Sequence, residues 1–201
     1  MTLKRDINTL ARRTPIAERA AAERLVSLFT RGGFLVTCPR ETAEEFRKIL
    51  QEAGIPSSSN ADWHSLRIES GWPLQGVDFD GSNLPQEVGR DVQAINFRKG
   101  CYLGQETIAR IDALGHVNKR LTTIRAAGEA APIPAGEELH ADGQPVGHVT
   151  SAAKSPTLRA TVGLAMVKRG FNGPGQRLTA GAASAEIIAT PAQALDPWPS
   201  L

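Results

Sequence analysis

The stretch KGCYLGQE, residues 99–106, holds the densest group of chemically unusual residues in the chain. The run over 103–114 predicts a helix that ends at Gly115, so Cys101 lies next to a helix N-terminus. Unpaired backbone N–H groups and the cationic side chain of Lys99 would both stabilise a thiolate there. Such a cysteine is a candidate nucleophile, redox thiol or soft-metal ligand, whereas an arbitrary cysteine is more often a small buried hydrophobe. From the residues alone, both interpretations stay open.

The segment before this stretch begins with a pattern typical of an α/β unit. Residues 15–30 have apolar side chains at helical spacing, and residues 34–38 form the short apolar run of a buried strand. Residues 41–53 again show an amphipathic helical pattern before Gly54. The stretch IPSSSN, at 55–60, is rich in turn-forming residues and predicts a linker.

A further helix, a loop and a short strand are expected between this linker and KGCYLGQE. The helix begins near Asn60 and ends by Gly71. Residues 74–94 contain several glycines and prolines with little periodicity, which predicts a loop. A short strand through Ile95 and Phe97 then leads into KGCYLGQE.

The C-terminal part of the chain has a different character. Short β-rich runs over 116–126, 145–151, 157–167 and 184–190 alternate with clusters of turn-forming residues. This pattern predicts a small β-barrel or sandwich. Four segments are therefore expected: an N-terminal extension (1–14), a mixed helix and strand region (15–115), a β domain (116–192) and a tail (193–201).

Composition excludes several classes of protein. The 201 residues include 23 basic and 21 acidic side chains, well mixed along the chain, which argues against direct nucleic-acid binding. No apolar stretch approaches the roughly 20 residues needed to span a bilayer, and the first thirteen residues lack the apolar core of a secretory signal. Cys38 and Cys101 fit no zinc-binding spacing, so no metal site is expected. These features predict a cytoplasmic protein.

Three ordered segments resemble a known family. KGCYLGQE is similar to the Lys-Gly-Cys-aromatic-x-Gly-Gln-Glu motif of the folate-binding YgfZ proteins, which are related to the glycine-cleavage T-protein. LRIESGWP, at 66–73, resembles a segment shared by this family and the T-protein aminomethyltransferases, and GHVNKRL, at 115–121, resembles the entry to their last domain. The resemblance implies an α+β fold, in which part of a folate-binding α/β domain precedes a small C-terminal β-barrel.

The resemblance also assigns roles to residues. It makes Cys101 the functional thiol, with Lys99 tuning its charge or holding an anionic group. It implies an accessory protein that assists the assembly or repair of iron–sulfur enzymes, including those that thiolate transfer RNA. Iron–sulfur proteins or cluster carriers would be its partners. Because two cysteines cannot complete the usual four-thiolate shell, any iron–sulfur cluster would be held transiently and shared.

The same resemblance implies a tetrahydrofolate site. Glu69 is the best candidate contact, since a carboxylate can accept two hydrogen bonds from the 2-amino and N3 groups of a pterin. Arg67, Gln105 and Glu106 are the further candidates for cofactor binding. Gln105 and Glu106 would orient the loop or pair with Lys99. The alternative for Glu69 is a carboxylate on a helix surface.

Two other functions stay open. One is folate-dependent aminomethyl transfer of the T-protein kind, although the catalytic aspartate of that family lies in a region with no counterpart assigned here. The other is an inactive fragment. We expect most of the first folate-binding domain to be missing, so that a second copy of the chain or a partner completes the folate pocket. On balance the motif favours a role that is not enzymatic.

Overall fold

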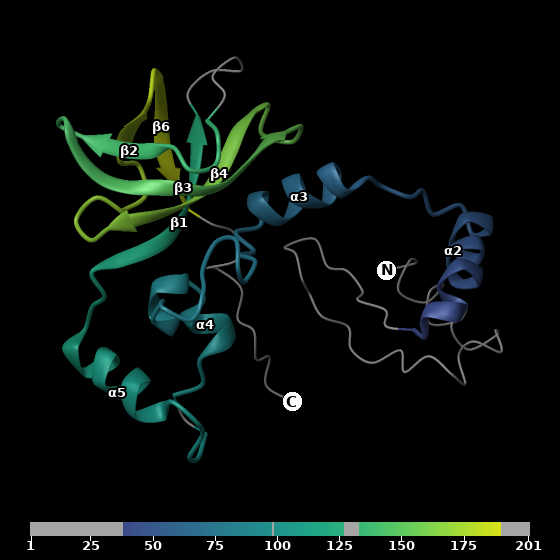
Figure 1. Ribbon diagram of the computed structural model, residues 1–201, viewed down its shortest axis with the longest axis horizontal. Coiled ribbons are helices and arrows are strands. Elements are labelled where there is room, and N and C mark those ends of the chain that lie inside the picture. The colour runs from purple at the N-terminus through teal and green to yellow at the C-terminus, as the bar shows by residue number, and fades with distance from the viewer. Residues whose placement is uncertain (1–37, 98, 127–132, 190–201) are drawn as a thin grey trace. The chain divides into compact units, whose positions relative to one another are not determined.

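The computed structural model describes residues 38–97, 99–126 and 133–189 (Figure 1). The chain divides into two compact units between Ser59 and Asn60. This division falls within the predicted linker IPSSSN. The helix predicted over 15–30, the strand over 34–38 except Cys38, the extension and the tail lie outside the described residues. The predicted domain boundaries at 115/116 and 192/193 stay predictions.

The first unit contains one described α-helix. A short 3-10 turn, η2 (Arg40–Thr42), leads into α2 (Ala43–Glu52), which corresponds to the helix predicted over 41–53. Two glutamates in its first turn interact favourably with the positive end of the helix dipole. Gly54 follows the helix in the left-handed conformation, with φ of 73°, which a glycine adopts without a steric penalty.

The second unit begins with α3 (Asn60–Glu69), and its helical part continues with η3 (Pro85–Val88), α4 (Asp91–Ala94) and α5 (Gln105–Leu114). The segment predicted as a loop over 74–94 therefore contains two short helical elements. α5 starts two residues later than predicted, and it ends as expected at Gly115, whose φ is 74°.

The strand predicted through Ile95 and Phe97 is wrong. Neither residue belongs to a strand, although Ile95 is buried. A strand needs a neighbour to accept and donate its backbone hydrogen bonds, and the sheet in this unit closes on itself without a free edge. Ile95 is therefore buried as a single apolar side chain in irregular backbone.

The C-terminal part forms a closed antiparallel barrel with the strand order β1-β4-β3-β2-β5-β6 (Figure 1). Its strands are β1 (Lys119–Ala126), β2 (Glu138–Ala141), β3 (Gln144–Ser155), β4 (Ala160–Lys168), β5 (Arg177–Ala180) and β6 (Ala183–Ile188). The barrel alternative of the prediction is confirmed. The β-rich runs located four strands, whereas β2 and β5 have only four residues each and too little pattern to be recognised.

Strand β4 provides the surface on which α3 packs against the barrel. Every residue of β4 except Lys168 is buried, which is typical of a strand covered on both faces. Ala165 and Val167 face the barrel interior, where they pack with residues such as Leu139. The opposite face of β4 packs with Ile68 of α3. This apolar contact holds α3 against the outside of the barrel.

Two glycines let the barrel strands approach one another closely. A Cβ atom on Gly147 would lie 2.3 Å from the carbonyl oxygen of Met166, and one on Gly163 would lie 2.9 Å from that of Ser151. Real Cβ atoms do not approach backbone oxygens so closely, so a side chain at either position would push β3 and β4 apart.

No helix in the described ranges has both the length and the apolar character needed to cross a membrane. A cytoplasmic location stays a prediction.

Candidate functional site

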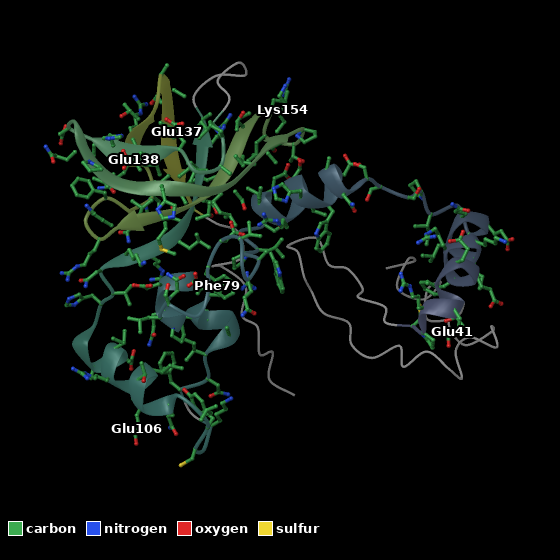
Figure 2. All side chains as sticks on the ribbon, in the orientation of Figure 1. Glu41, Phe79, Glu106, Glu137, Glu138 and Lys154 are labelled. Atoms are coloured by element: carbon green, nitrogen blue, oxygen red, sulfur yellow. The ribbon has the colours of Figure 1, made fainter. Side chains whose placement is uncertain are left out.

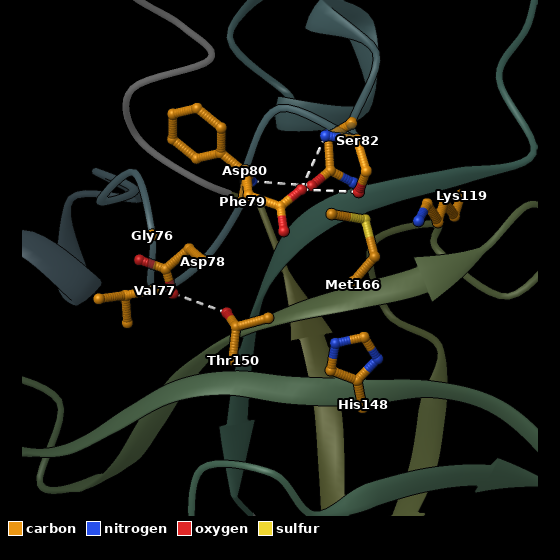
Figure 3. Close-up of a pocket in the computed structure, with 11 residues that line it drawn as sticks. Gly76, Val77, Asp78, Phe79, Asp80, Ser82, Lys119, His148, Thr150 and Met166 are labelled. Atoms are coloured by element: carbon orange, nitrogen blue, oxygen red, sulfur yellow. Dashed lines mark hydrogen bonds between the residues drawn. The ribbon is translucent and has the colours of Figure 1, made fainter.

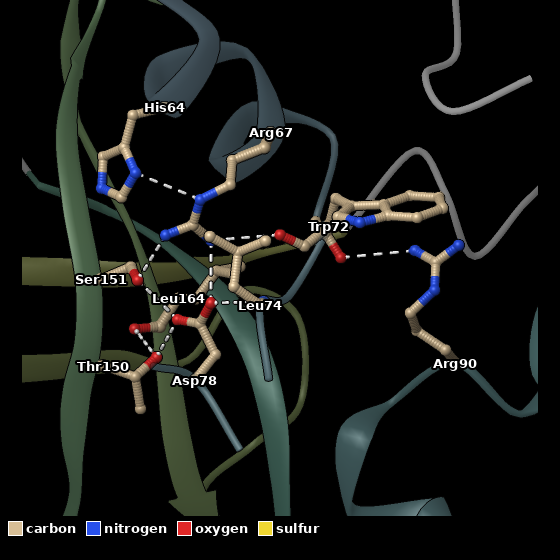
Figure 4. A network of polar contacts seen from close by, with 10 residues as sticks. His64, Arg67, Trp72, Leu74, Asp78, Arg90, Thr150, Ser151 and Leu164 are labelled. Carbon is tan, nitrogen blue, oxygen red and sulfur yellow. Dashed lines mark hydrogen bonds and ion pairs between the residues drawn. The ribbon is translucent and has the colours of Figure 1, made fainter. Parts of the chain in front are cut away.

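Arg67 of α3 is the centre of a buried polar network (Figure 4). Its Nη1 lies 2.8 Å from Asp78 Oδ2, and neither side chain has any exposed surface. The same Nη1 donates to the carbonyl oxygen of Trp72 at 3.1 Å, and Nη2 donates to Ser151 Oγ at 2.7 Å. Nε donates to His64 Nδ1 at 3.2 Å. We call this set of contacts the Arg67 network.

The Asp78 carboxylate is equally occupied. Besides Arg67, the backbone N–H of Leu74 donates to Oδ2 at 2.9 Å. The hydroxyl groups of Thr150 and Ser151 both donate to Oδ1, each at 2.6 Å. Because each oxygen accepts two hydrogen bonds, the buried charge is compensated, which is the condition for a buried ion pair to be tolerated.

A β-bulge makes this double contact possible. Adjacent side chains of a regular strand point to opposite faces of the sheet. In β3, however, Val149 pairs with Ala165 and Ser151 pairs with Leu164, so Thr150 is the extra residue of a bulge. The bulge lets the hydroxyls of Thr150 and Ser151 reach the same carboxylate. No signal in the sequence marks this position.

The network also changes the titration of His64. Burial is the largest cause that lowers the pKa of His64, and the nearby positive charge of Arg67 lowers it further, while Asp78 acts in the opposite direction. His64 Nδ1 must be unprotonated to accept the hydrogen bond from Arg67. The imidazole is therefore held in its neutral form.

Arg67 was predicted as a cofactor ligand, and the structure gives its guanidinium a different set of partners. The group is fully buried and bonded to protein atoms at all three nitrogens. Contact between Arg67 and a ligand stays a prediction. The contacts that are present connect α3 to the following loop and to β3, so they stabilise the fold.

Glu69 is the last residue of α3 and is partly buried. Among the residues that the structure describes, none donates a hydrogen bond to its carboxylate or forms an ion pair with it. The turn that follows is held in place by Arg90, whose guanidinium lies 4.3 Å from the centre of the Trp72 ring. Glu69 thus offers an uncompensated carboxylate beside a well-supported turn.

Cys101 is exposed, in the loop that precedes α5. Lys99 Nζ lies 4.4 Å from the centre of the Tyr102 ring, and the Lys99 backbone N–H donates to Asn96 Oδ1 at 3.0 Å. Gly104 adopts the left-handed conformation, with φ of 84°, immediately before the helix. The motif therefore presents an accessible thiol in a turn that also carries a positive charge.

The other two candidates lie at the start of α5. Gln105 is partly buried, and Glu106 is exposed, with its side chain extending outward from the helix in Figure 2. Within the described ranges, no hydrogen bond or ion pair connects either residue to Lys99 or Glu69. The structure therefore does not join the thiol motif and the Glu69 carboxylate through direct polar contacts.

Sequence reasoning missed the polar contacts that hold α5 and α4 in this unit. Gln86 Nε2 donates to the carbonyl oxygen of Ile108 in α5 at 3.0 Å. Asp91 of α4 forms an ion pair with Arg120 of β1. Burial raises the pKa of Asp91, which the nearby Arg120 partly offsets. These residues are ordinary in the sequence, and only the fold pairs them.

A pocket of about 280 Å³ lies beside the barrel (Figure 3). Residues of the loop 76–83 form one side of it, and residues of β1, β3 and β4 form the other. None of its lining residues was singled out from the sequence. Across the residues that the structure describes, no group of three or more His, Cys, Asp or Glu side chains could hold a metal ion.

Comparison with known proteins defines the class to which this fold belongs. Residues 119–195 match the family model of the glycine cleavage T-protein C-terminal barrel domain. The crystal structure of the glycine cleavage system aminomethyltransferase T from Bartonella henselae superposes with a TM-score of 0.65 at 19% sequence identity. The match covers 83% of this chain and 47% of that one, and it shows that the fold is T-protein-like.

Two relatives with known names are similar to parts of this chain. The chain is 38% identical over 106 residues to an aminomethyltransferase of Frankia alni, a match that covers 53% of the chain and 28% of the relative. It is 40% identical over 73 residues to the tRNA-modifying protein YgfZ of Colwellia psychrerythraea, covering 36% and 22%. The chain is therefore similar to the T-protein barrel domain over residues 119–195 and to these two relatives over shorter parts of their length. The chain spans only about a third or less of the length of such relatives.

Proposed function

We propose that the protein is a folate-binding, YgfZ-like accessory factor that assists the assembly or repair of iron–sulfur enzymes, with Cys101 as its functional thiol. The observation that carries the proposal is the exposure of Cys101 in the turn before α5. A buried cysteine would serve packing, whereas an exposed thiol beside a helix N-terminus can react with a partner. The similarity to a YgfZ protein supports the same role.

The surroundings of Cys101 suit the transient handling of a cluster or sulfur group. Lys99, two residues away and over the Tyr102 ring, adds a positive charge that can attract an anionic cluster or sulfur group. A cluster would be cargo, held jointly with an iron–sulfur protein or carrier, because one exposed thiolate supplies a fraction of the usual four ligands. The partner must therefore bring most of the ligands.

Of the residues proposed to contact tetrahydrofolate, Glu69 is better placed to do so than Arg67. The partly buried Glu69 carboxylate has no polar partner among the described residues, so it can accept the paired N–H groups of a pterin. Arg67 has no exposed atom to offer. Gln105 and Glu106 would orient the loop before α5, and a second copy of the chain or another protein would complete the pocket. Bound tetrahydrofolate would supply a carrier of one-carbon units.

A second candidate function is folate-dependent aminomethyl transfer. The identity to an aminomethyltransferase over 106 residues favours it. Only the accessory function requires the Cys101 thiol, because a cysteine has no evident role in aminomethyl transfer. Replacing this residue therefore separates them.

The test is complementation in a bacterium whose own YgfZ gene has been deleted. The chain, Cys101→Ser and the matched control Cys38→Ser would be expressed in turn, and thiolated nucleosides of transfer RNA would be quantified by mass spectrometry. We expect the wild type and Cys38→Ser to restore thiolation and Cys101→Ser to fail. Restoration by Cys101→Ser would refute the thiol role. Failure of the wild type would favour an inactive fragment.

Folate binding is tested separately by calorimetry on the purified chain. Tetrahydrofolate should bind to the wild type, and Glu69→Ala should weaken binding by about tenfold or more, the equivalent of about 1.4 kcal/mol. Glu186→Ala, on the exposed side of β6, is the matched control and should bind as the wild type does. Equal binding by Glu69→Ala would show that Glu69 is not the pterin ligand.

A further inference from the structure

The pocket beside the barrel is separate from the proposed thiol and folate residues, since neither Cys101 nor Glu69 lines it. The loop 76–83 contributes Asp80 and Phe79, and the barrel contributes Lys119, His148 and Met166 (Figure 3). Its volume of about 280 Å³ is close to the lower end of the usual range for small-molecule sites. What it would bind depends on which polar groups are still available.

Several lining groups are already occupied by protein partners. Asp78 and Thr150 belong to the Arg67 network and bond to one another at 2.6 Å. Asn83 accepts from the backbone N–H of Asp80 at 3.0 Å and donates to Glu87 Oε2 at 3.0 Å. These groups shape the pocket, but they have little capacity left for a ligand.

Within the described residues, one carboxylate oxygen of Asp80 accepts no hydrogen bond. Its Oδ1 accepts from the backbone N–H of Ser82 at 2.8 Å and from its hydroxyl at 2.6 Å. These hydrogen bonds lower the pKa of Asp80, so the group is ionised at neutral pH. Among the described residues, none bonds to Oδ2. Asp80 thus presents a negative charge to the pocket.

Lys119 and His148 give the pocket hydrogen-bond donors, in contrast to the acceptor oxygens of Asp80. Lys119 Nζ forms a long ion pair with Glu87 Oε2 at 3.9 Å, which is beyond hydrogen-bond distance, so its N–H groups can still donate to a ligand. That oxygen already accepts from Asn83 and from the backbone N–H of Leu84. His148 is exposed on β3 and makes no hydrogen bond within the part of the chain that is described. Both side chains can donate to an anionic group.

We propose that this pocket binds a small zwitterion of the amino-acid type, with its carboxylate at Lys119 and His148 and its ammonium group at Asp80 Oδ2. Met166, which lies between Asp80 and Lys119 in Figure 3, offers apolar surface for the carbon atoms between the two charges. A ligand with a single charge would make only one of these two contacts, so it would bind more weakly. The inference is independent of the proposed function, because it uses none of the same residues.

The experiment titrates the full chain with glycine, β-alanine and 4-aminobutyrate, and with acetate and methylammonium as probes of a single charge. Binding is followed by amide chemical shifts in NMR spectra at constant ionic strength. At least one zwitterion should saturate the shifts of residues 76–83 and bind about tenfold more tightly than either single-charge probe. Equal affinity for acetate or methylammonium, or no saturable binding of any zwitterion, would overturn the proposal.

Variants assign the effect to the pocket. Asp80→Asn and Lys119→Gln should each weaken the best zwitterion by about tenfold, whereas Lys154→Gln and Glu186→Gln should not change it. Both pocket positions are at least partly exposed, so these variants should fold, which thermal melting checks. Unchanged binding in both pocket variants would also refute the site.

Discussion

Arg67 on α3 and Asp78 in the following loop form an ion pair with Nη1 2.8 Å from Oδ2, and neither side chain has any exposed surface. α3 also packs on the barrel through Ile68, which is fully buried. The ion pair fixes the orientation of α3 on the barrel, which an apolar contact alone does not, because Ser151 of β3 accepts from Arg67 and donates to Asp78. One side chain from the barrel therefore joins both charges.

Removing one charge of this pair should be strongly destabilising. Arg67→Met leaves the Asp78 carboxylate buried without its cation, and we expect the free energy of unfolding to fall by about 3–5 kcal/mol. Urea denaturation measures the effect. The double variant Arg67→Met/Asp78→Leu should lose less than the sum of the single variants. Glu138→Gln, at an exposed carboxylate whose Oε2 lies 3.4 Å from His140 Nε2, is the control and should change stability by about 0.5 kcal/mol or less. Additive losses would contradict a direct coupling.

The hydroxyl of Ser151 should matter more than an exposed hydroxyl. Ser151→Ala leaves an N–H of Arg67 buried without an acceptor, and we expect a loss of about 1–3 kcal/mol in the free energy of unfolding. Ser65→Ala removes a hydrogen bond to the carbonyl oxygen of Lys154 that lies near solvent, and its cost should be about 0.5 kcal/mol or less. Chemical denaturation of both variants provides the comparison. Similar costs would mean that water reaches the Arg67 network.

The close approach of β3 and β4 predicts a steric effect at Gly147. Gly147→Ala places a methyl group against the Met166 carbonyl oxygen, and we expect a loss of about 1–3 kcal/mol. Gly173→Ala is the matched control, because the nearest atom to its added Cβ is 3.9 Å away and its φ is not positive. Thermal melts should show a lower midpoint for the first variant and little change for the second. A wild-type midpoint for Gly147→Ala would mean that the strands separate at little cost.

His64 should make stability depend on pH. Its pKa in the folded protein lies below the ordinary value of 6.5, so the unfolded chain binds this proton more readily. The contribution is fully present above pH 6.5 and is lost as the pH falls from there through the folded-state pKa. Urea midpoints at pH 7.5 and 5.5 should differ less in His64→Gln than in the wild type, since glutamine accepts from Arg67 without titrating. An unchanged difference in His64→Gln would exclude this origin.

Part of the fold could be predicted because it is encoded in local pattern. Gly115 marks the end of α5, apolar periodicity located α2, start and stop residues located α3, and β-rich runs located four barrel strands. Ile95 and Phe97 misled the prediction, because an apolar run shows that a residue is buried without showing whether a neighbouring strand is available. The four-residue strands β2 and β5 were missed since their position depends on barrel closure.

Some residues of the candidate site could likewise be recognised in the sequence, and others could not. Cys101 stands out from its immediate neighbours, and its exposure is consistent with the interpretation as a reactive thiol. Arg67 was chosen because of its position in a motif, and the structure surrounds it with partners from two other segments, the loop after α3 and strand β3. The pocket was invisible in the sequence, because Asp80, His148 and Met166 are far apart along the chain and unremarkable where they stand.

The sequence by itself therefore determined the positions of the main helices and of four strands, the β-rich character of the C-terminal half and the motif that carries Cys101, since periodicity and turn-forming residues act over a few neighbours. Only the tertiary structure decided the closure of the barrel, the bulge at Thr150, the burial of the Arg67–Asp78 pair and the pocket beside β3. The physical reason is that burial and hydrogen-bond partners depend on distance in space. Residues as far apart as Arg67 and Ser151 become neighbours only when the chain has folded.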